Sequence, residues 1–273
     1  MPLNKKLIEA AKKGESKGII DTYIANQGDL NAIDDSWDDQ YRGYTLLHYA
    51  VANKHSGLVS SLLSGLLTYR ANPNIQSHRG LTPLHLAAIN GDQESAILLL
   101  DNDAQLELKD IEGYTPLHRA VLSGHVEMVG LLIEKGAKVN VRCEARCSTP
   151  LVAATQLPEA IWKSMIDVLI DKGKADVHAT FLYNNQLISL VQFAMYNGKY
   201  NFVEFFEEKL RKNQKLLHDD QAKKIKELEK RINELEKEIK ELKVKPNSNQ
   251  EKKENNNTTT LFGLSPFATR KMS

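Results

Sequence analysis

The sequence predicts an all-α fold: a solenoid of stacked helix-turn-helix units with β-hairpin-like tips, followed by a long helix and a disordered tail. A segment that begins at Gly80 is repeated 33 residues later, at Gly113. Each copy contains two short helical patterns, and neither helix could bury its apolar face without a neighbour. Beyond Asn213, apolar residues recur every three or four positions, which is typical of a helix that pairs with another.

The second copy, from Gly113 to Asn140, shows how each unit is built. Thr115 and Pro116 mark a helix start, because a hydroxyl caps free N–H groups and proline suits the first helical position. Gly124 supplies the left-handed exit that a C-terminal cap prefers, and a more apolar helical pattern then runs to Gly136. The unit is therefore predicted to be a helix pair.

Both copies contain the motif TPLHxA, and at this spacing the chain resembles the ankyrin-repeat family, which implies an ankyrin-repeat solenoid. The motif residues are Thr82, Pro83, Leu84, His85 and Ala87 in the first copy and Thr115, Pro116, Leu117, His118 and Ala120 in the second. Partial copies flank them at Gly43–Asn74 and Thr149–Val177, and a degenerate copy covers Gln186–Lys209.

Four regions are predicted along the chain. They are an N-terminal capping ankyrin-like unit with an acidic loop (1–40), the repeats (41–212, clear at 80–145 and degenerate on either side), a coiled coil (215–245) and a disordered tail (246–273). In the capping unit, one helix ends at Gly14 and a second covers Ile19–Ile24. The tail is too polar to fold, apart from a short apolar and basic ending at 261–273.

The acidic loop around Trp37 contains Asp34, Asp35, Asp38 and Asp39. It lacks the alternating oxygen ligands and the glycine of a calcium-binding loop, so we expect a solvated loop. Trp37 then packs on the capping unit or is offered to a partner.

Some positions depart from the repeat pattern. Asp103 stands where Gly136 and Gly173 stand in other units, and we expect it to adopt the left-handed conformation at modest cost. After Thr149 the glycine that should end the first helix is missing, and Pro158 can start a new helix instead. This fourth unit is predicted to be distorted.

Composition excludes several classes of function. Lys and Arg number 36 against 35 Asp and Glu, which gives no electrostatic reason to expect nucleic acid as a partner. No apolar run is long enough to span a bilayer, and no secretory signal is recognisable. Two cysteines, Cys143 and Cys147, favour a reducing compartment and a cytoplasmic protein, and their C-x-x-x-C spacing has no second pair to complete a zinc site.

No catalytic motif is recognisable, and we predict no enzyme activity, no cofactor and no metal. His48, His85 and His118 recur once per unit, which is too far apart for a shared zinc ion. The family resemblance implies instead that these histidines hydrogen-bond between neighbouring repeats.

The resemblance also implies that a protein partner docks on the concave face, made of the hairpin tips and the inner side of the first helices. Tyrosine and arginine, which are enriched at binding hot spots, cluster there. The candidate residues are Tyr41, Arg42, Tyr44, His78, Arg79, Leu81, Ile89, Asn90, Ile111, Glu112, Tyr114, Leu122, Ser123 and Arg146. In the alternative interpretation, Tyr44 and Tyr114 only cover the turn, and the arginines are solvated.

The apolar residues of the long helix form a heptad seam: Ile225, Leu228, Ile232, Leu235, Ile239 and Leu242. Isoleucine at a and leucine at d favour a parallel two-stranded coiled coil, in which Lys224, Arg231 and Glu238 attract the following e residues Glu229, Glu236 and Lys243. An antiparallel pair would place Arg231 against Arg231. The alternative to a parallel homodimer is a lone helix stabilised by i,i+4 pairs.

Three hypotheses of function follow. The first is a non-enzymatic interaction module or adaptor that binds a protein partner on its concave surface, with the coiled coil pairing chains. The second is a bacterial effector secreted into a host cell cytosol through a C-terminal signal, because the layout is similar to that of bacterial ankyrin effectors. The third is an enzyme with an unrecognised site.

Overall fold

A computed structural model describes residues 5–14, 29–35, 38–64, 70–143, 148–178, 180–183 and 186–244. The chain divides into two compact units, Met1–Lys209 and Leu210–Ser273. Within the described ranges, no helix is long and apolar enough to cross a membrane. The second helix of the capping unit, Trp37, Arg146, Cys147 and the tail at 246–273 lie outside the described residues.

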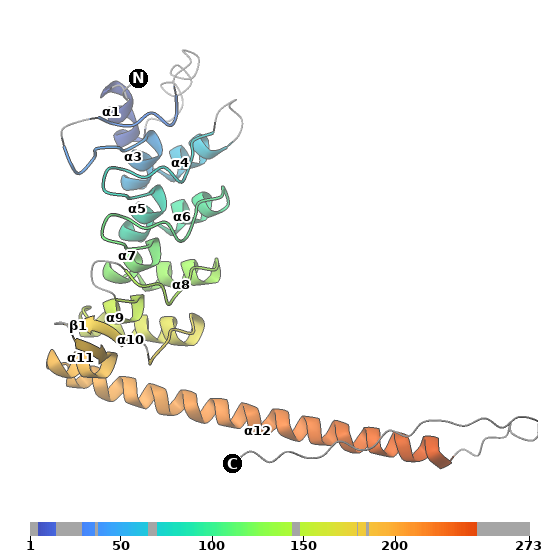
Figure 1. Cartoon of the computed structure of the whole chain (residues 1–273). Coiled ribbons are helices and arrows are strands. Elements are labelled where there is room, and N and C mark those ends of the chain that lie inside the picture. The colour runs from blue at the N-terminus through green and yellow to red at the C-terminus, as the bar shows by residue number, and fades with distance from the viewer. Residues whose placement is uncertain are drawn as a thin grey trace, which may run out of the picture. The chain divides into compact units, whose positions relative to one another are not determined.

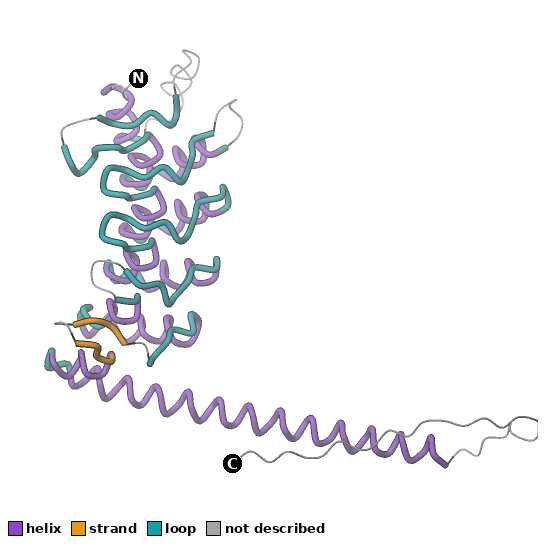
Figure 2. The backbone as a smooth tube through the Cα atoms, viewed as in Figure 1, coloured by secondary structure: helices purple, strands orange, loops and turns teal. Residues whose placement is uncertain are grey.

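Within residues 1–209, successive helix pairs stack in chain order (Figure 1). The helices are α1 (Lys5–Lys13), α3 (Leu46–Ala52), α4 (Ser56–Leu63), α5 (Pro83–Asn90), α6 (Gln93–Leu100), α7 (Pro116–Leu122), α8 (Val126–Glu134), α9 (Pro150–Ala154), α10 (Glu159–Asp167), α11 (Leu190–Tyr196) and α12 (Tyr200–Val244). Loops join each pair to the next, as the teal segments of Figure 2 show. The stack is thus the mostly helical repeat solenoid that the sequence predicted.

The first helices α3, α5, α7 and α11 start with the same reciprocal cap, whereas Thr149 forms no such cap on α9. In α5, the hydroxyl of Thr82 accepts a hydrogen bond from the backbone N–H of His85 (3.3 Å), and the Nδ1 atom of His85 accepts one from the backbone N–H of Thr82 (3.1 Å). Two N–H groups that the helix cannot pair are satisfied in this way. The same box forms at Thr45 and Thr115, and at Ser189 with Gln192 in place of histidine.

The hairpin tips of neighbouring units contact each other through their backbones. The N–H of Ile111 donates to the carbonyl of Arg79 (3.1 Å), and the N–H of His78 donates to the carbonyl of Arg42 (2.9 Å). Gly80 makes this approach possible, because it has φ +71° and a Cβ there would lie 2.8 Å from the Cα of Asp110. The tips therefore keep a fixed spacing along the stack.

A two-stranded antiparallel sheet interrupts the helices after the fourth unit. Strands β1 (Thr180–Tyr183) and β2 (Gln186–Ser189) pair with Phe181 opposite Ile188. We assigned Gln186–Lys209 to a degenerate repeat, and its first four residues are strand instead. The ring of Phe193 on α11 packs edge-on against Phe181 at 5.3 Å, which ties the hairpin to the last helix pair.

The expected irregularities are partly right. Asp103 has φ +66°, which confirms the left-handed residue expected there. Gly173 was expected to share this conformation but has φ −81°, and Lys174 at φ +53° takes it one residue later. The reason is local: the segment Val168–Lys172 is a π-helix, whose wider turn delays the exit from the helix. As expected, α10 starts directly after Pro158.

A second set of histidines packs on the glycine that follows the first helix of the preceding unit. The Nε2 atom of His125 bonds to the carbonyl of Ile89 (2.9 Å), and a Cβ on Gly91 would lie 2.7 Å from the His125 ring. The same arrangement joins His55 to Gly14. The imidazole fits because glycine has a hydrogen where any other residue has a Cβ atom.

At the junction between the first and second units, the repeat register places Lys54 where the glycine stands and Asp92 where the histidine stands. Lys54 adopts φ +58°, a strained conformation for a residue with a Cβ. We expect Lys54→Gly to raise the free energy of unfolding by about 0.5–1 kcal/mol, and Asp92→His alone to lower it. The double variant should exceed the sum of the singles by about 1 kcal/mol. Urea unfolding of all four proteins measures this coupling, and strict additivity would contradict the proposed packing.

Candidate partner-binding surface

The structure divides the candidate partner-binding residues by exposure. Arg42, His78, Arg79, Ile111 and Ser123 are exposed, and Tyr41, Ile89, Asn90, Glu112 and Leu122 are half-buried. Ile111 exposes 67% of its surface although it is apolar. These residues lie on the tips and at the ends of the first helices, so their side chains are accessible to a partner.

Tyr44, Leu81 and Tyr114 are corrections, because their side chains are buried. The Tyr44 ring stacks on His48 with centroids 5.0 Å apart, and Tyr114 lies 5.6 Å from His118. Burial raises the pKa of Tyr44 to about 12, and nearby Tyr41 adds to this. These residues cover the start of the first helix, as the alternative interpretation had it, and we exclude them from the docking surface.

The accessible tip residues, exposed or half-buried, form two rows. Tyr41, His78 and Ile111 occupy equivalent places in successive units, and Arg42, Arg79 and Glu112 occupy the next place along each tip. Neither Arg42 nor Arg79 makes an ion pair with a described residue. Glu112 differs, because its carboxylate accepts a hydrogen bond from Arg119 at 3.1 Å.

Asp110 is the central polar group of the third tip and was not among the predicted site residues. Its side chain is fully buried and accepts hydrogen bonds from the backbone N–H groups of Glu112 (2.9 Å) and Tyr114 (3.0 Å). Arg119 on α7 donates to the same carboxylate at 2.6 Å and stacks over the Tyr114 ring, 4.8 Å from its centroid. Burial disfavours the charged guanidinium, but the carboxylates prevail and raise the pKa of Arg119 above its ordinary value.

Equivalent pairs recur in the other units with different chemistry. The register matches Asp110 and Arg119 to Ser77 and Leu86 in one neighbour, and in the other to Cys143 and Ala153. Ser77 accepts a bond from the N–H of Leu81 (3.2 Å) and faces no charged residue across the helix. Thus the unit with a buried carboxylate at its tip also has a hydrogen-bond donor on its first helix, whereas the unit with Ser77 has Leu86 there.

The first unit contains the same kind of pair, which corrects one expectation. Asp34 was predicted to be solvated with the rest of the acidic loop, but it is buried and accepts a hydrogen bond from the hydroxyl of Tyr49. Asp35, Asp38 and Asp39 are exposed, as expected. Asp34 occupies the place of Asp110, because its backbone N–H donates to the carbonyl of Tyr44 (2.7 Å) as that of Asp110 donates to Tyr114 (3.0 Å). The sequence register hides this match, since Gln40 stands three residues before Gly43 as Asp110 stands before Gly113.

The recurring histidines bond from one repeat to the next, which confirms the expectation. Their Nε2 atoms bond to the carbonyls of Leu81 (2.9 Å), Tyr114 (3.0 Å) and Ser148 (3.4 Å). Each Nδ1 atom accepts a backbone N–H bond from the capping threonine. The proton therefore resides on Nε2, and a second proton on Nδ1 would face a donor.

The same three rings are unsuited to acid–base work near neutral pH. Burial lowers the pKa of His48, His85 and His118 to about 4, so all three are neutral at pH 7. Within the described ranges, no three His, Cys, Asp or Glu side chains lie close enough to hold a metal ion.

Comparisons with known proteins find ankyrin repeats. The family model described as ankyrin repeats (3 copies) matches residues 61–143, and that described as ankyrin repeats (many copies) matches residues 30–87. SH3 and multiple ankyrin repeat domains protein 1 of Homo sapiens is 42% identical over 69 residues, which cover 25% of this chain and 3% of that protein. The B-cell lymphoma 3 protein homolog of Mus musculus is 34% identical over 70 residues, 26% of this chain and 16% of that protein. The chain thus matches a small part of each relative.

Proposed function

Because the chain carries ankyrin repeats across residues 30–143, we propose that it is a non-enzymatic adaptor that binds a protein partner on the exposed tips of its first, second and third units. Ankyrin repeats are generally protein–protein interaction modules. One observation carries the choice of surface: Arg42, Arg79 and Ile111 are exposed on adjacent tips, and neither arginine has an ion-pair partner in the described structure.

These three side chains have the properties of a docking surface. Two guanidinium groups offer bidentate hydrogen bonds, and an exposed isoleucine supplies apolar area that folding leaves in water. The backbone bonds between the tips keep their spacing constant, so little conformational entropy is lost when a partner binds. Ile89 and Leu122 extend the apolar area onto the ends of the first helices.

The test is capture of the partner by a triple variant. We expect Arg42→Ala, Arg79→Ala and Ile111→Ala together to weaken binding about a hundredfold, because each side chain contributes at least about 1 kcal/mol at a hot spot. Partners recovered with the parent chain are titrated against both proteins. A matched variant on the opposite side, Glu94→Ala, Glu127→Ala and Ile97→Ala, should bind normally. If the triple variant retains the circular dichroism and the affinity of the parent, the surface assignment is wrong.

Pairing of two chains through the seam is the second part of the proposal. In the unit Leu210–Ser273, the described seam residues Ile225, Leu228, Ile232 and Leu235 expose 56%, 56%, 55% and 41% of their surface. Exposed isoleucine and leucine at heptad spacing favour a parallel dimer. The side chains of Ile239 and Leu242 lie outside the described residues. Two copies would present two docking surfaces and raise avidity.

Light scattering tests the pairing. We expect the intact chain to approach twice the monomer mass with rising concentration, and Ile232→Asp to remain monomeric, because a charge at an a position opposes burial of the seam. Lys230→Asp is the control, since position 230 lies on the outer face of the heptad. A monomer at all concentrations would reject pairing while leaving the docking surface on the repeats in place.

A further inference from the structure

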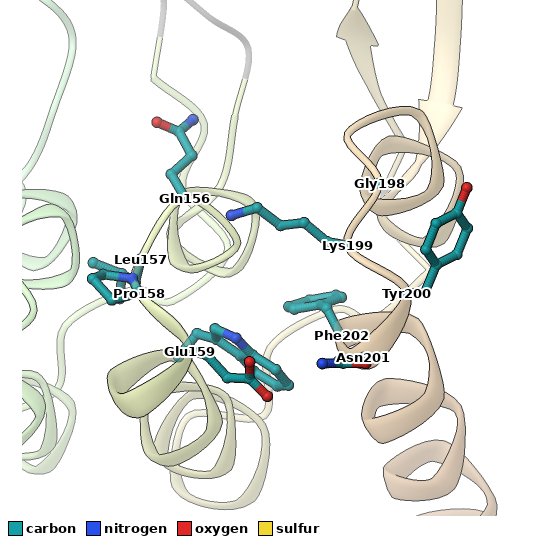
Figure 3. A pocket seen from close by; sticks show the side chains of 10 residues that line it. Gln156, Leu157, Pro158, Glu159, Gly198, Lys199, Tyr200, Asn201 and Phe202 are labelled. Carbon is teal, nitrogen blue, oxygen red and sulfur yellow. The ribbon is translucent and has the colours of Figure 1, made fainter.

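A cavity of about 540 Å³ lies between the fourth unit and the last helix pair (Figure 3). One wall is the connection Gln156–Glu159, and the other is the start of α12 with the preceding turn. The cavity follows from the sequence of the fourth unit, where Leu157 and Pro158 replace the Asn–Gly step found at Asn90 and Gly91. No histidine can pack on proline as His125 packs on Gly91, and the next unit places Lys199 at this point instead.

Lys199 is the charged group of the cavity. Its ammonium group crosses toward the opposite wall, as Figure 3 shows, and donates a hydrogen bond to the carbonyl of Thr155. An ammonium group has three N–H donors, so two remain for another acceptor. In the described structure Lys199, which directly precedes α12, forms no ion pair, whereas Lys209 within α12 lies within 2.7 Å of both Asp167 and Asp171.

The remaining lining residues include one charged group, Glu159. Glu159 already has a counter-charge, because its carboxylate lies 3.5 Å from the amine of Lys163. Leu157 and Pro158 give one side of the cavity an apolar wall, and Phe202 and Trp162 form its base, with ring centroids 5.0 Å apart. A ligand with a negative head and an apolar neighbour would match this arrangement.

An exposed apolar patch extends beyond the rim. Met195, Tyr196 and Tyr200 expose 51%, 68% and 68% of their surface, within five residues of Lys199. The Tyr200 ring lies at the edge of the cavity and points away from Lys199 (Figure 3). A terminal repeat is normally polar on the side that faces water, so stability does not explain these side chains. A small ligand held by the cavity would leave them uncovered, whereas an extended peptide would reach them.

We propose that this junction is a second docking site, which binds an extended peptide whose carboxylate pairs with Lys199 while adjoining apolar side chains cover Tyr196 and Tyr200. The site lies outside the tip surface and is independent of the adaptor function proposed above. Because a peptide that enters the cavity would contact Trp162, binding has an internal optical signal.

The test uses the full chain with Trp37→Phe, which leaves Trp162 as the single tryptophan of the two. The probe is a ten-residue synthetic peptide of glycine and serine with a central glutamate followed by leucine and phenylalanine. We expect a saturable change in Trp162 fluorescence below about 1 mM peptide. Replacing the glutamate of the peptide by glutamine should weaken binding about tenfold or more, since hydrogen bonds to charged groups are the stronger ones.

Protein variants separate charge from folding. Lys199→Met should weaken binding about tenfold, Lys199→Arg should retain most of it, and Tyr200→Ala should weaken it at unchanged circular dichroism. The triple variant of the tips should bind the probe normally. A signal that does not saturate, or one that is equal for the glutamine peptide, would overturn the proposal. Equal binding of phenylpropionate alone would show a small-acid site and reject the peptide.

Discussion

The free energy of unfolding should fall steeply as the pH drops from 6.5 to 5, because three buried histidines resist protonation. The pKa of His48, His85 and His118 is lowered by burial to about 4, whereas the unfolded chain titrates near 6.5. Between these values the unfolded state binds more protons than the folded state, so stability is present above pH 6.5 and is lost as the pH falls. The loss should be about 2 kcal/mol per histidine at pH 5 and should level off below pH 4.

Urea unfolding between pH 7.5 and 5 measures this dependence. Three histidines give a slope of about 4 kcal/mol per pH unit near pH 5. The chain supplies its own control, since Gln192 occupies the histidine position of the last pair and accepts the bond from the N–H of Ser189 at 2.8 Å. His85→Gln should therefore keep the cap and reduce the slope by about 1.4 kcal/mol per pH unit. If the slope of the wild-type protein corresponds to a difference of one bound proton or less, the three histidines are not buried in the neutral form.

Replacing Arg119 should be among the most destabilising single changes in the repeats. Arg119→Leu removes the cation that lies 2.6 Å from the buried carboxylate of Asp110, and the charge is left without compensation. We expect the free energy of unfolding to fall by about 3 kcal/mol, which is typical when one partner of a buried pair is removed. Urea unfolding at pH 7.5 measures it.

A neighbouring unit suggests the rescue. The double variant Asp110→Ser and Arg119→Leu copies the pair Ser77 and Leu86, which needs no charge. It should recover most of the loss, so that two substitutions harm the fold less than one. If the double variant is no more stable than Arg119→Leu, the tip is held by something other than this pair.

The sequence predicted the helix pairs well because their signals are local. Threonine, proline and glycine act on the backbone within a few residues, and the 33-residue spacing places the units side by side. The strands β1 and β2 were missed, although Phe181, Tyr183 and Ile188 have the alternation of a hairpin, because the degenerate repeat was predicted to begin at Gln186, inside the hairpin. Lys174 was missed because a π-helix shifts the register by one residue.

The candidate site was predicted less well, because burial depends on packing between units. Tyr44 and Arg42 are close neighbours in sequence, yet one side chain is buried against a histidine and the other faces water. The Asp110–Arg119 pair joins residues nine positions apart, a spacing with no meaning within a helix or strand. It becomes recognisable only in the structure, where Asp34 and Tyr49 form the equivalent pair. Residues whose partners lie on another element cannot be assigned from periodicity alone.

The two kinds of bond around each tip bear on how such a chain can lengthen or shorten in evolution. The histidines donate hydrogen bonds to backbone carbonyls, which every residue possesses. A unit can therefore stack on any neighbouring unit that a gene duplication supplies. Both members of the Asp110–Arg119 pair belong to one unit. A recombination crossover between the tip and the first helix would leave the buried carboxylate without a cation, opposite the leucine of another copy. Breakpoints that fall in α6 and α8 keep each tip residue together with its partner on the first helix. This architecture therefore tolerates the gain or loss of whole units.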